Sequence, residues 1–160
     1  MARRVFFSFH YDNDVFRVQQ VRNMGVIDGN QPISPSEWED VKRKGEVSIQ
    51  RWIDDNIKNC ECVIVLIGSE TANRPWVIHE IKRAWELDKG LFGVHIHNLK
   101  DARTGQKSRM GENPFDKLTF NNGEKLSTKV KRYDLNSNDA YNDLRNNLQQ
   151  MVEIAIKERK

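Results

Sequence analysis

The sequence predicts an α/β fold, a flavodoxin-like three-layer sandwich built around a mostly parallel sheet of roughly five strands. Short runs of β-branched and aromatic residues alternate with segments whose apolar residues recur at helical spacing. One run, CVIVLI at 62–67, is apolar throughout, which is typical of a strand covered on both faces. The 160 residues correspond to a single domain, 1–160, and their composition, 38% hydrophobic and 31% charged, is that of a folded globule.

The first elements follow from local patterns. Residues 5–9 form an apolar and aromatic run, which predicts a strand. Residues 14–24 carry valines at helical spacing and predict a helix. The glycines, prolines and scattered charges of 25–45 indicate a loop with room for one short strand at most. Residues 46–59 return to helical periodicity, with isoleucines in one row.

The helix after the central strand is marked at both ends. A turn is expected over 68–74, and Pro75 suits the first helical position because its missing N–H group costs nothing there. We expect this helix to run to Lys89. Gly90 is then expected to be the left-handed residue that ends it.

The rest of the chain continues the alternation. Residues 91–97 and 130–135 predict two further strands, and 138–160 predicts an amphipathic helix that closes the fold. The polar segment 98–124, which lies between these two strands, is long for a loop in a small domain and indicates a functional or mobile segment. Because ligands bind beyond the carboxyl ends of the strands in such sheets, the residues that follow each strand are the site candidates.

Composition argues against several classes of partner. The 26 basic and 23 acidic residues are mostly interspersed and leave a net charge of +3, so no nucleic-acid partner is expected. The longest apolar run, 62–68, is far shorter than the about 20 residues needed to cross a bilayer. The first residues lack the apolar stretch of a signal peptide, so we expect a cytoplasmic protein with no membrane contact.

Basic residues nevertheless gather in two groups along the chain. Solvated loops explain both groups, and a diphosphate-bearing ligand would also be accommodated by them. The groups are Lys100, Arg103, Lys107 and Arg109, and Lys125, Lys129, Lys131 and Arg132.

Motif searches exclude common chemistries and predict no metal site. GxGxxG, GxxxxGK[ST] and GxSxG are absent, which argues against the dinucleotide fingerprint, the P-loop and the ester-hydrolase elbow. Cys60 and Cys62 are expected to be reduced and buried. His95 and His97 share one strand face but have no carboxylate beside them at ligand spacing.

Glu80 is the strongest catalytic candidate. Trp76 lies four residues before it on the same helix, so the two side chains share a face and can touch. We expect Glu80 at the edge of the buried stripe near the helix N-terminus, where the helix dipole keeps its carboxylate ionised. The alternative is an ordinary surface glutamate paired with Arg83 or Arg74.

Two segments carry a resemblance to Toll/interleukin-receptor (TIR) domains. RVFFSFH at 4–10 looks like their opening strand, and WVIHEI at 76–81 is similar to their tryptophan-x-x-x-glutamate motif. The resemblance implies a TIR-like sandwich. In it, Glu80 corresponds to the catalytic glutamate of the TIR members that cleave NAD.

Within the TIR superfamily the sequence most resembles the signal-producing TIR-like protein of bacterial Thoeris antiphage defence. That resemblance implies NAD as substrate, no cofactor, and an ADP-ribose-derived second messenger, with a cyclic form favoured. It also implies a phage-derived trigger and a separate effector. The sequence lacks a conventional glycine-rich TIR loop, which leaves homo-oligomer formation open. The matching strings are RVFFSFHY at 4–11, SEWED at 36–40, VLIGSET at 65–71, WVIHEI at 76–81 and NPFDKL at 113–118.

The substrate-binding candidates lie around this glutamate at the ligand end of the predicted sheet. Ser8 and His10 alternate onto one face of the first strand and Phe9 onto the other. Trp38 lies in a polar loop, where it either covers the pocket or anchors the loop. The full set is Ser8, Phe9, His10, Tyr11, Trp38, Ser69 and Trp76, with Glu80 as the catalytic residue.

One carboxylate is enough for the expected reaction. The nicotinamide of NAD is attached through a positively charged nitrogen and leaves as a neutral molecule, so no second acid has to protonate it, unlike the usual glycosidase leaving group. Two alternatives remain open on the sequence. One is a TIR-like interaction module without turnover, and the other is an enzyme like the nucleoside deoxyribosyltransferases, which cleaves nucleosides.

Overall fold

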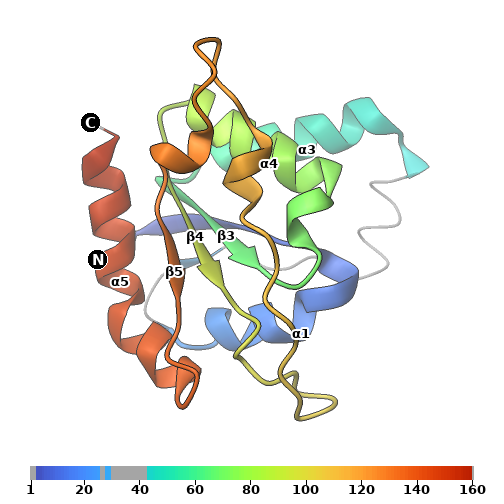
Figure 1. Ribbon diagram of the computed structural model, residues 1–160. Coiled ribbons are helices and arrows are strands. Elements are labelled where there is room, and N and C mark those ends of the chain that lie inside the picture. Colours follow the sequence, from blue (N-terminus) through green and yellow to red (C-terminus); the bar gives the residue numbers. More distant parts are fainter. Residues whose placement is uncertain (1–2, 26–27, 30–42, 160) are drawn as a thin grey trace.

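A parallel sheet forms the centre of the molecule (Figure 1). The structure is a computed structural model that describes residues 3–25, 28–29 and 43–159. Within them the strand order is β2-β1-β3-β4-β5, the order of flavodoxin-like sheets, and every paired strand is parallel, which confirms the predicted α/β class. The strands are β1 (Arg4–Ser8), β2 (Asp28–Gly29), β3 (Cys62–Ile67), β4 (Gly90–His95) and β5 (Arg132–Asp134).

Helices cover both faces of the sheet, so the sheet is the buried middle layer of the fold. Helices α1 and α5 pack on one face, and α3 and α4 pack on the other (Figure 1). Short 3₁₀ helices lie in the connections between the described elements. The helices are α1 (Tyr11–Arg22), α3 (Glu46–Lys58), α4 (Pro75–Glu86) and α5 (Ala140–Glu158), with η1 (Thr71–Asn73), η2 (Pro114–Lys117) and η3 (Leu126–Thr128).

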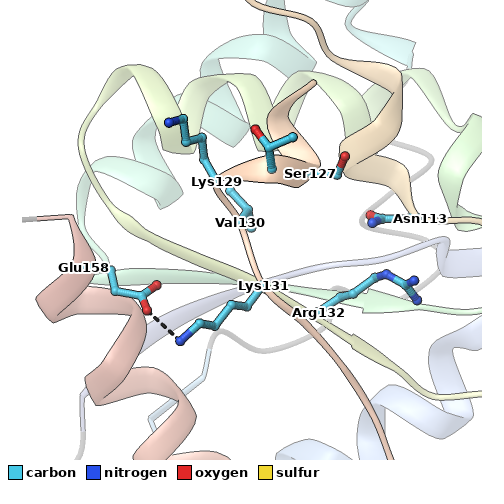
Figure 2. Close-up of a pocket in the computed structure, with 8 residues that line it drawn as sticks. Asn113, Ser127, Lys129, Val130, Lys131, Arg132 and Glu158 are labelled. Atoms are coloured by element: carbon cyan, nitrogen blue, oxygen red, sulfur yellow. Dashed lines mark ion pairs between the residues drawn. The ribbon is translucent and has the colours of Figure 1, made fainter. Parts of the chain in front are cut away.

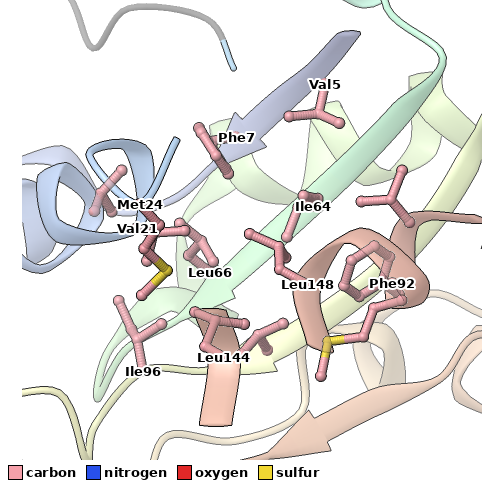
Figure 3. Close-up of a cluster of buried hydrophobic side chains, with 14 of the residues drawn as sticks. Val5, Phe7, Val21, Met24, Ile64, Leu66, Phe92, Ile96, Leu144 and Leu148 are labelled. Carbon is pink, nitrogen blue, oxygen red and sulfur yellow. The ribbon is translucent and has the colours of Figure 1, made fainter. Parts of the chain in front are cut away.

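The central strand β3 divides its side chains between two hydrophobic cores. All six of its residues are buried. Ile64 and Leu66 join the core beneath α1 and α5, where Figure 3 shows Leu144 and Leu148 of α5 packed beside them. The alternate residues of β3 join the core beneath α3 and α4. Since both faces are covered, the strand has no polar positions, and this explains its unbroken apolar sequence.

Helix α4 ends earlier than expected, and a different residue ends it. The last helical residue is Glu86 rather than Lys89, and the left-handed conformation falls on Asp88, with φ of 56°. The expectation for Gly90 is therefore wrong, because Gly90 is the first residue of β4. A Cβ atom there would lie 3.0 Å from the backbone nitrogen of Ile156, so Gly90 packs closely against α5 and a side chain there would have to displace its neighbours.

The long segment after β4 packs back onto the sheet. Phe115 is fully buried in the core beneath α3 and α4. Gly111 lies directly against the end of β3, since a Cβ atom at this position would be 2.0 Å from the carbonyl oxygen of Gly68. Residues 98–124 thus cross the carboxyl end of the sheet, where a ligand is expected.

Candidate active site

Ser8 and Glu80 meet at the carboxyl end of β1. Ser8 ends β1 and, because side chains alternate along a strand, faces α4 as Phe6 does. Glu80 lies on the second turn of α4, the helix that follows β3. The Ser8 hydroxyl donates a 2.6 Å hydrogen bond to Glu80 Oε1, and the two residues are 1% and 8% exposed. The fold therefore buries a carboxyl group at the predicted ligand end.

The protonation state of Glu80 differs from the expectation. Glu80 lies inside, among the buried residues of α4, and this burial raises its pKa to about 8, although the hydrogen bond from Ser8 acts in the opposite direction. The helix dipole is too weak to keep such a buried carboxyl group ionised at neutral pH. Glu80 of the unliganded protein is therefore mostly protonated at pH 7.

The surface alternative for Glu80 is wrong. Its two expected cationic partners are engaged elsewhere, Arg83 with Asp54 at 3.0 Å and Arg74 with Glu70 at 3.4 Å. A carboxyl group that is 8% exposed and bonded to a buried serine is not a solvated glutamate.

Trp76 lies one turn before Glu80 and is partly buried against the core beneath α3 and α4. The ring partner of Trp76 is His79, with centroids 5.8 Å apart in an edge-to-face arrangement. The indole therefore packs at the first turn of α4, the helix that carries Glu80.

The other residues predicted around β1 do not all gather at Glu80. Phe9 packs against the core beneath α1 and α5, on the opposite side of the sheet. His10 occupies the N-cap position of α1, and its carbonyl oxygen accepts the Asp14 N–H group. Tyr11 is the first residue of α1, but its side chain, like all of Trp38, lies outside the described residues.

Ser69 belongs to a second polar cluster that the sequence analysis missed. Asn13 Nδ2 donates to Ser69 Oγ at 3.3 Å and to Asp14 Oδ1 at 3.2 Å. Asp14 is 1% exposed, and burial raises its pKa to about 6. The space beside it exists because residue 68 is glycine, whose Cβ would lie 2.1 Å from Asp14 Oδ2. Two sequence features could have predicted this cluster. They are an aspartate in the first turn of the helix after β1 and a glycine directly after β3.

Arg17 connects this cluster to the segment that follows β4, and it was missed as well. Its Nε donates to the Leu99 carbonyl oxygen at 2.8 Å and its Nη2 to that of Gln106 at 3.0 Å. Its Nη1 lies 3.8 Å from Asp14 and 3.9 Å from Asp101. A 6% exposed arginine with four such contacts ties the segment after β4 to α1.

Two histidines mark the end of β4. The ring of His95 is buried and its Nε2 lies 2.8 Å from Arg132 Nη1. Burial, and next the charge of Arg132, lower the pKa of His95 to about 4, so its ring is neutral and Nε2 accepts the hydrogen bond. The His97 ring lies 6.0 Å from that of His95. No group of three metal-ligating side chains occurs among the described residues.

Three residues of the second basic group, Lys129, Lys131 and Arg132, line a hollow of about 500 Å³ (Figure 2). Lys131 is paired there with Glu158 at 2.7 Å, and Lys129 lies 3.8 Å from Glu124. Glu80 and Ser8 are not among the lining residues, so this hollow is separate from their site. The lining residues are Asn113, Ser127, Thr128, Lys129, Val130, Lys131, Arg132 and Glu158.

The strand order β2-β1-β3-β4-β5 and the helices on both faces of the parallel sheet define an α/β sandwich domain, the class that the TIR resemblance implied. A family model described as "Thoeris protein ThsB, TIR-like domain" matches residues 6–101 of the 160, more than half of the chain. The chain belongs to this ThsB family of TIR-like domains. Within the described residues, no helix combines the length and apolarity needed to cross a membrane.

One similar curated protein comes from Bacillus cereus (strain MSX-D12) and is named "Putative cyclic ADP-D-ribose synthase ThsB1". The two are 42% identical over 125 residues, which are 75% of this chain and 65% of that relative, so the match spans just under two thirds of the relative. The solved structure of a CMP N-glycosidase from Clostridium botulinum, BcmB, aligns with 92% of this chain and 99% of its own at 15% identity. Its TM-score of 0.42 is too low to support an inference.

Proposed function

We propose that this protein is an NAD-cleaving enzyme in which Glu80 is the catalytic carboxylate. The observation that carries the proposal is the buried Glu80, bonded to Ser8 at the carboxyl end of a parallel sheet. A carboxyl group with a pKa raised by burial at the ligand end of a fold is typical of catalytic sites. Membership of the ThsB family and the name of the relative support NAD as the substrate.

The reaction breaks the bond between the nicotinamide nitrogen and C1′ of the ribose. The bond electrons pass to the pyridinium nitrogen, so nicotinamide leaves neutral and positive charge develops on the ribose. The Glu80 carboxylate stabilises this charge in a site with little water, where such an interaction is strong. Water attacking C1′ would yield ADP-ribose, and a nitrogen or hydroxyl group of the same nucleotide would yield a cyclic isomer. Each route releases one proton.

Substrate binding prepares the base form of Glu80. The free carboxyl group is protonated at neutral pH because burial raises its pKa to about 8. A cationic nicotinamide ring beside it favours the ionised form and lowers that pKa. The proton then passes to solvent as NAD binds. The Ser8 hydroxyl holds the carboxylate in one orientation through this change.

We further infer that the product is an ADP-ribose-derived messenger, with the cyclic form favoured by the name of the relative. In this proposal the whole of 1–160 acts as one domain in the cytoplasm, and needs no cofactor or metal. A phage-derived trigger starts synthesis, and the messenger reaches a separate effector by diffusion.

Chromatography of purified protein with NAD tests the proposal. We expect wild-type protein to release nicotinamide, at rest or after addition of an extract from phage-infected cells, and Glu80→Gln protein to release at least about 100-fold less. The exposed variant Glu112→Gln serves as the matched control and should keep full turnover. Absence of nicotinamide in both conditions would favour an interaction module. Release of base from a nucleoside instead of NAD would favour a nucleoside-cleaving enzyme.

A further inference from the structure

A backbone hydrogen bond joins His97 and Ser108 beyond the end of β4, and each of the two residues carries a buried polar group. The Ser108 N–H group donates to the His97 carbonyl oxygen at 3.0 Å, so the segment that leaves β4 returns to it at this point. His97 is 9% exposed. Its Nδ1 and the Oγ of Ser108 are buried, and neither has a hydrogen-bond partner in the part of the chain that the structure describes. Buried polar groups without a partner are rare, and each calls for a physical explanation such as a bound water, an ion or a ligand.

These groups lie on the sheet face that carries the proposed catalytic residue. Along β4, Val94 belongs to the core beneath α1 and α5, so His95 points to the α4 side, and the His97 ring is 6.0 Å from it. Ser8 points to the same side from β1. With β3 between them, β1 and β4 are about 10 Å apart, and His97 lies four residues beyond Gly93, the β4 residue level with Ser8. A dinucleotide is long enough to reach from one to the other.

Positive charge accompanies these two groups. Lys107 and Arg109 flank Ser108 in the sequence, within the first basic group noted above. The Arg109 side chain is 70% exposed, and its ion pair with Glu70 is long, at 3.9 Å. An exposed pair of this length contributes little, so Arg109 can turn to an anionic ligand at small cost.

The segment that carries Ser108 is held in a fixed position. Arg17 bonds the carbonyl oxygens of Leu99 and Gln106, and Gly111 packs on Gly68. Both ends of 99–111 are therefore attached to the body of the protein. A rigid attachment reduces the entropy lost when side chains of the segment bind a ligand.

We propose that His97 Nδ1–H and Ser108 Oγ–H bind the diphosphate of the dinucleotide, with Arg109 supplying opposite charge. The inference rests on the proposed function and adds a second contact region to it. Hydroxyl and imidazole donors satisfy phosphate oxygens well, and charged acceptors make these bonds strong. The scissile bond is then held near Glu80 by binding energy gained from the diphosphate.

The test compares two substrates that share the scissile bond. NAD contains the diphosphate and nicotinamide riboside does not. For Ser108→Ala and His97→Gln we expect the KM for NAD to rise about tenfold or more, while kcat changes less than about threefold. The kcat/KM for nicotinamide riboside should stay within about twofold of wild type. Ser48→Ala, on α3, is the matched control and should change neither substrate.

Three outcomes would overturn the inference. These are an unchanged KM for NAD in folded Ser108→Ala protein, equal losses for both substrates, or a loss confined to kcat. Circular dichroism and the unfolding midpoint establish that each variant is folded, and Ser108→Ala is the decisive variant if His97→Gln is unstable. If wild type cleaves neither substrate, the proposed function fails instead. Calorimetric binding of ADP-ribose to wild type and Ser108→Ala then decides the inference, since equal affinities would contradict it.

Discussion

The Ser8 hydroxyl lies 2.6 Å from Glu80 Oε1, although 72 residues separate the two in the sequence. The contact joins the end of β1 to the second turn of α4, and only the packing of α4 on the sheet makes it. Ser8 is therefore the described side chain that acts most directly on the charge of Glu80, which gives two predictions for the pH dependence of turnover.

The first concerns wild-type protein. Since burial raises the pKa of Glu80 to about 8, kcat/KM for NAD should rise with pH and level off above this value. The profile of kcat should rise at lower pH, because the cationic nicotinamide lowers the pKa in the complex. Steady-state rates measured between about pH 5 and about pH 10 check this prediction, because protein stability restricts measurements outside that range. A kcat/KM that falls over this range would contradict the ionised carboxylate as the active form.

The second concerns Ser8→Ala. This variant loses a hydrogen bond that favours the ionised carboxylate, so the pKa of Glu80 should rise further, by about one unit. The kcat/KM for NAD at pH 7 should fall about tenfold and recover at high pH. The measurement is the same pH profile, with Ser48→Ala as the control. A loss that is equal at every pH would mean that Ser8 acts on substrate binding and not on Glu80.

Stability should depend on pH through the same carboxyl group. Its pKa is about 8 in the folded protein against 4.5 when unfolded, so the folded state holds the proton more tightly. The stabilisation is complete below pH 4.5 and disappears as pH rises through about 8. The Glu80→Gln protein does not lose stability in this way. At pH 9 its free energy of unfolding should therefore exceed that of the wild type by on the order of a few kcal/mol.

Urea unfolding at several pH values measures this difference. Asp14 adds a decline of its own in both proteins, because its pKa is raised from 3.8 to about 6. The two stability curves should therefore run together below about pH 4.5, separate progressively between pH 4.5 and about 8, and stay apart above that range. Parallel curves up to pH 9 would show that the folded protein does not hold Glu80 protonated.

Sequence patterns were sufficient for the fold and for the helix that carries Glu80, but not for the environment of this residue. The unbroken apolar run of β3 and the spacing of Trp76 and Glu80 are local signals, and both led to the correct elements. The protonation of Glu80 depends on burial by residues far away in the sequence, so the dipole argument failed. Asp14 and Arg17 were missed for the same reason, since their partners lie in the segments after β3 and β4.

Arg17 offers a prediction about the segment it holds. Arg17→Lys keeps the charge but cannot bond both the Leu99 and the Gln106 carbonyl oxygens while facing Asp14. We expect a loss of about 2 kcal/mol in the free energy of unfolding and faster hydrogen exchange over 99–108. Arg145→Lys, exposed on α5, is the matched control. Unchanged exchange over 99–108 would show that other contacts hold the segment.

Gly111 tests the same attachment from the other end of the segment. In Gly111→Ala a Cβ atom would lie 2.0 Å from the Gly68 carbonyl oxygen, and backbone on both sides prevents an easy adjustment. We expect a destabilisation of about 3 kcal/mol, with amide shifts at Gly68 and Ser69 in NMR spectra. Gly105→Ala is the comparison, because nothing lies within 4 Å of its Cβ position and only its φ of 68° opposes alanine. Its cost should be about 1 kcal/mol. Equal effects of the two substitutions would contradict the packing of this segment on the end of β3.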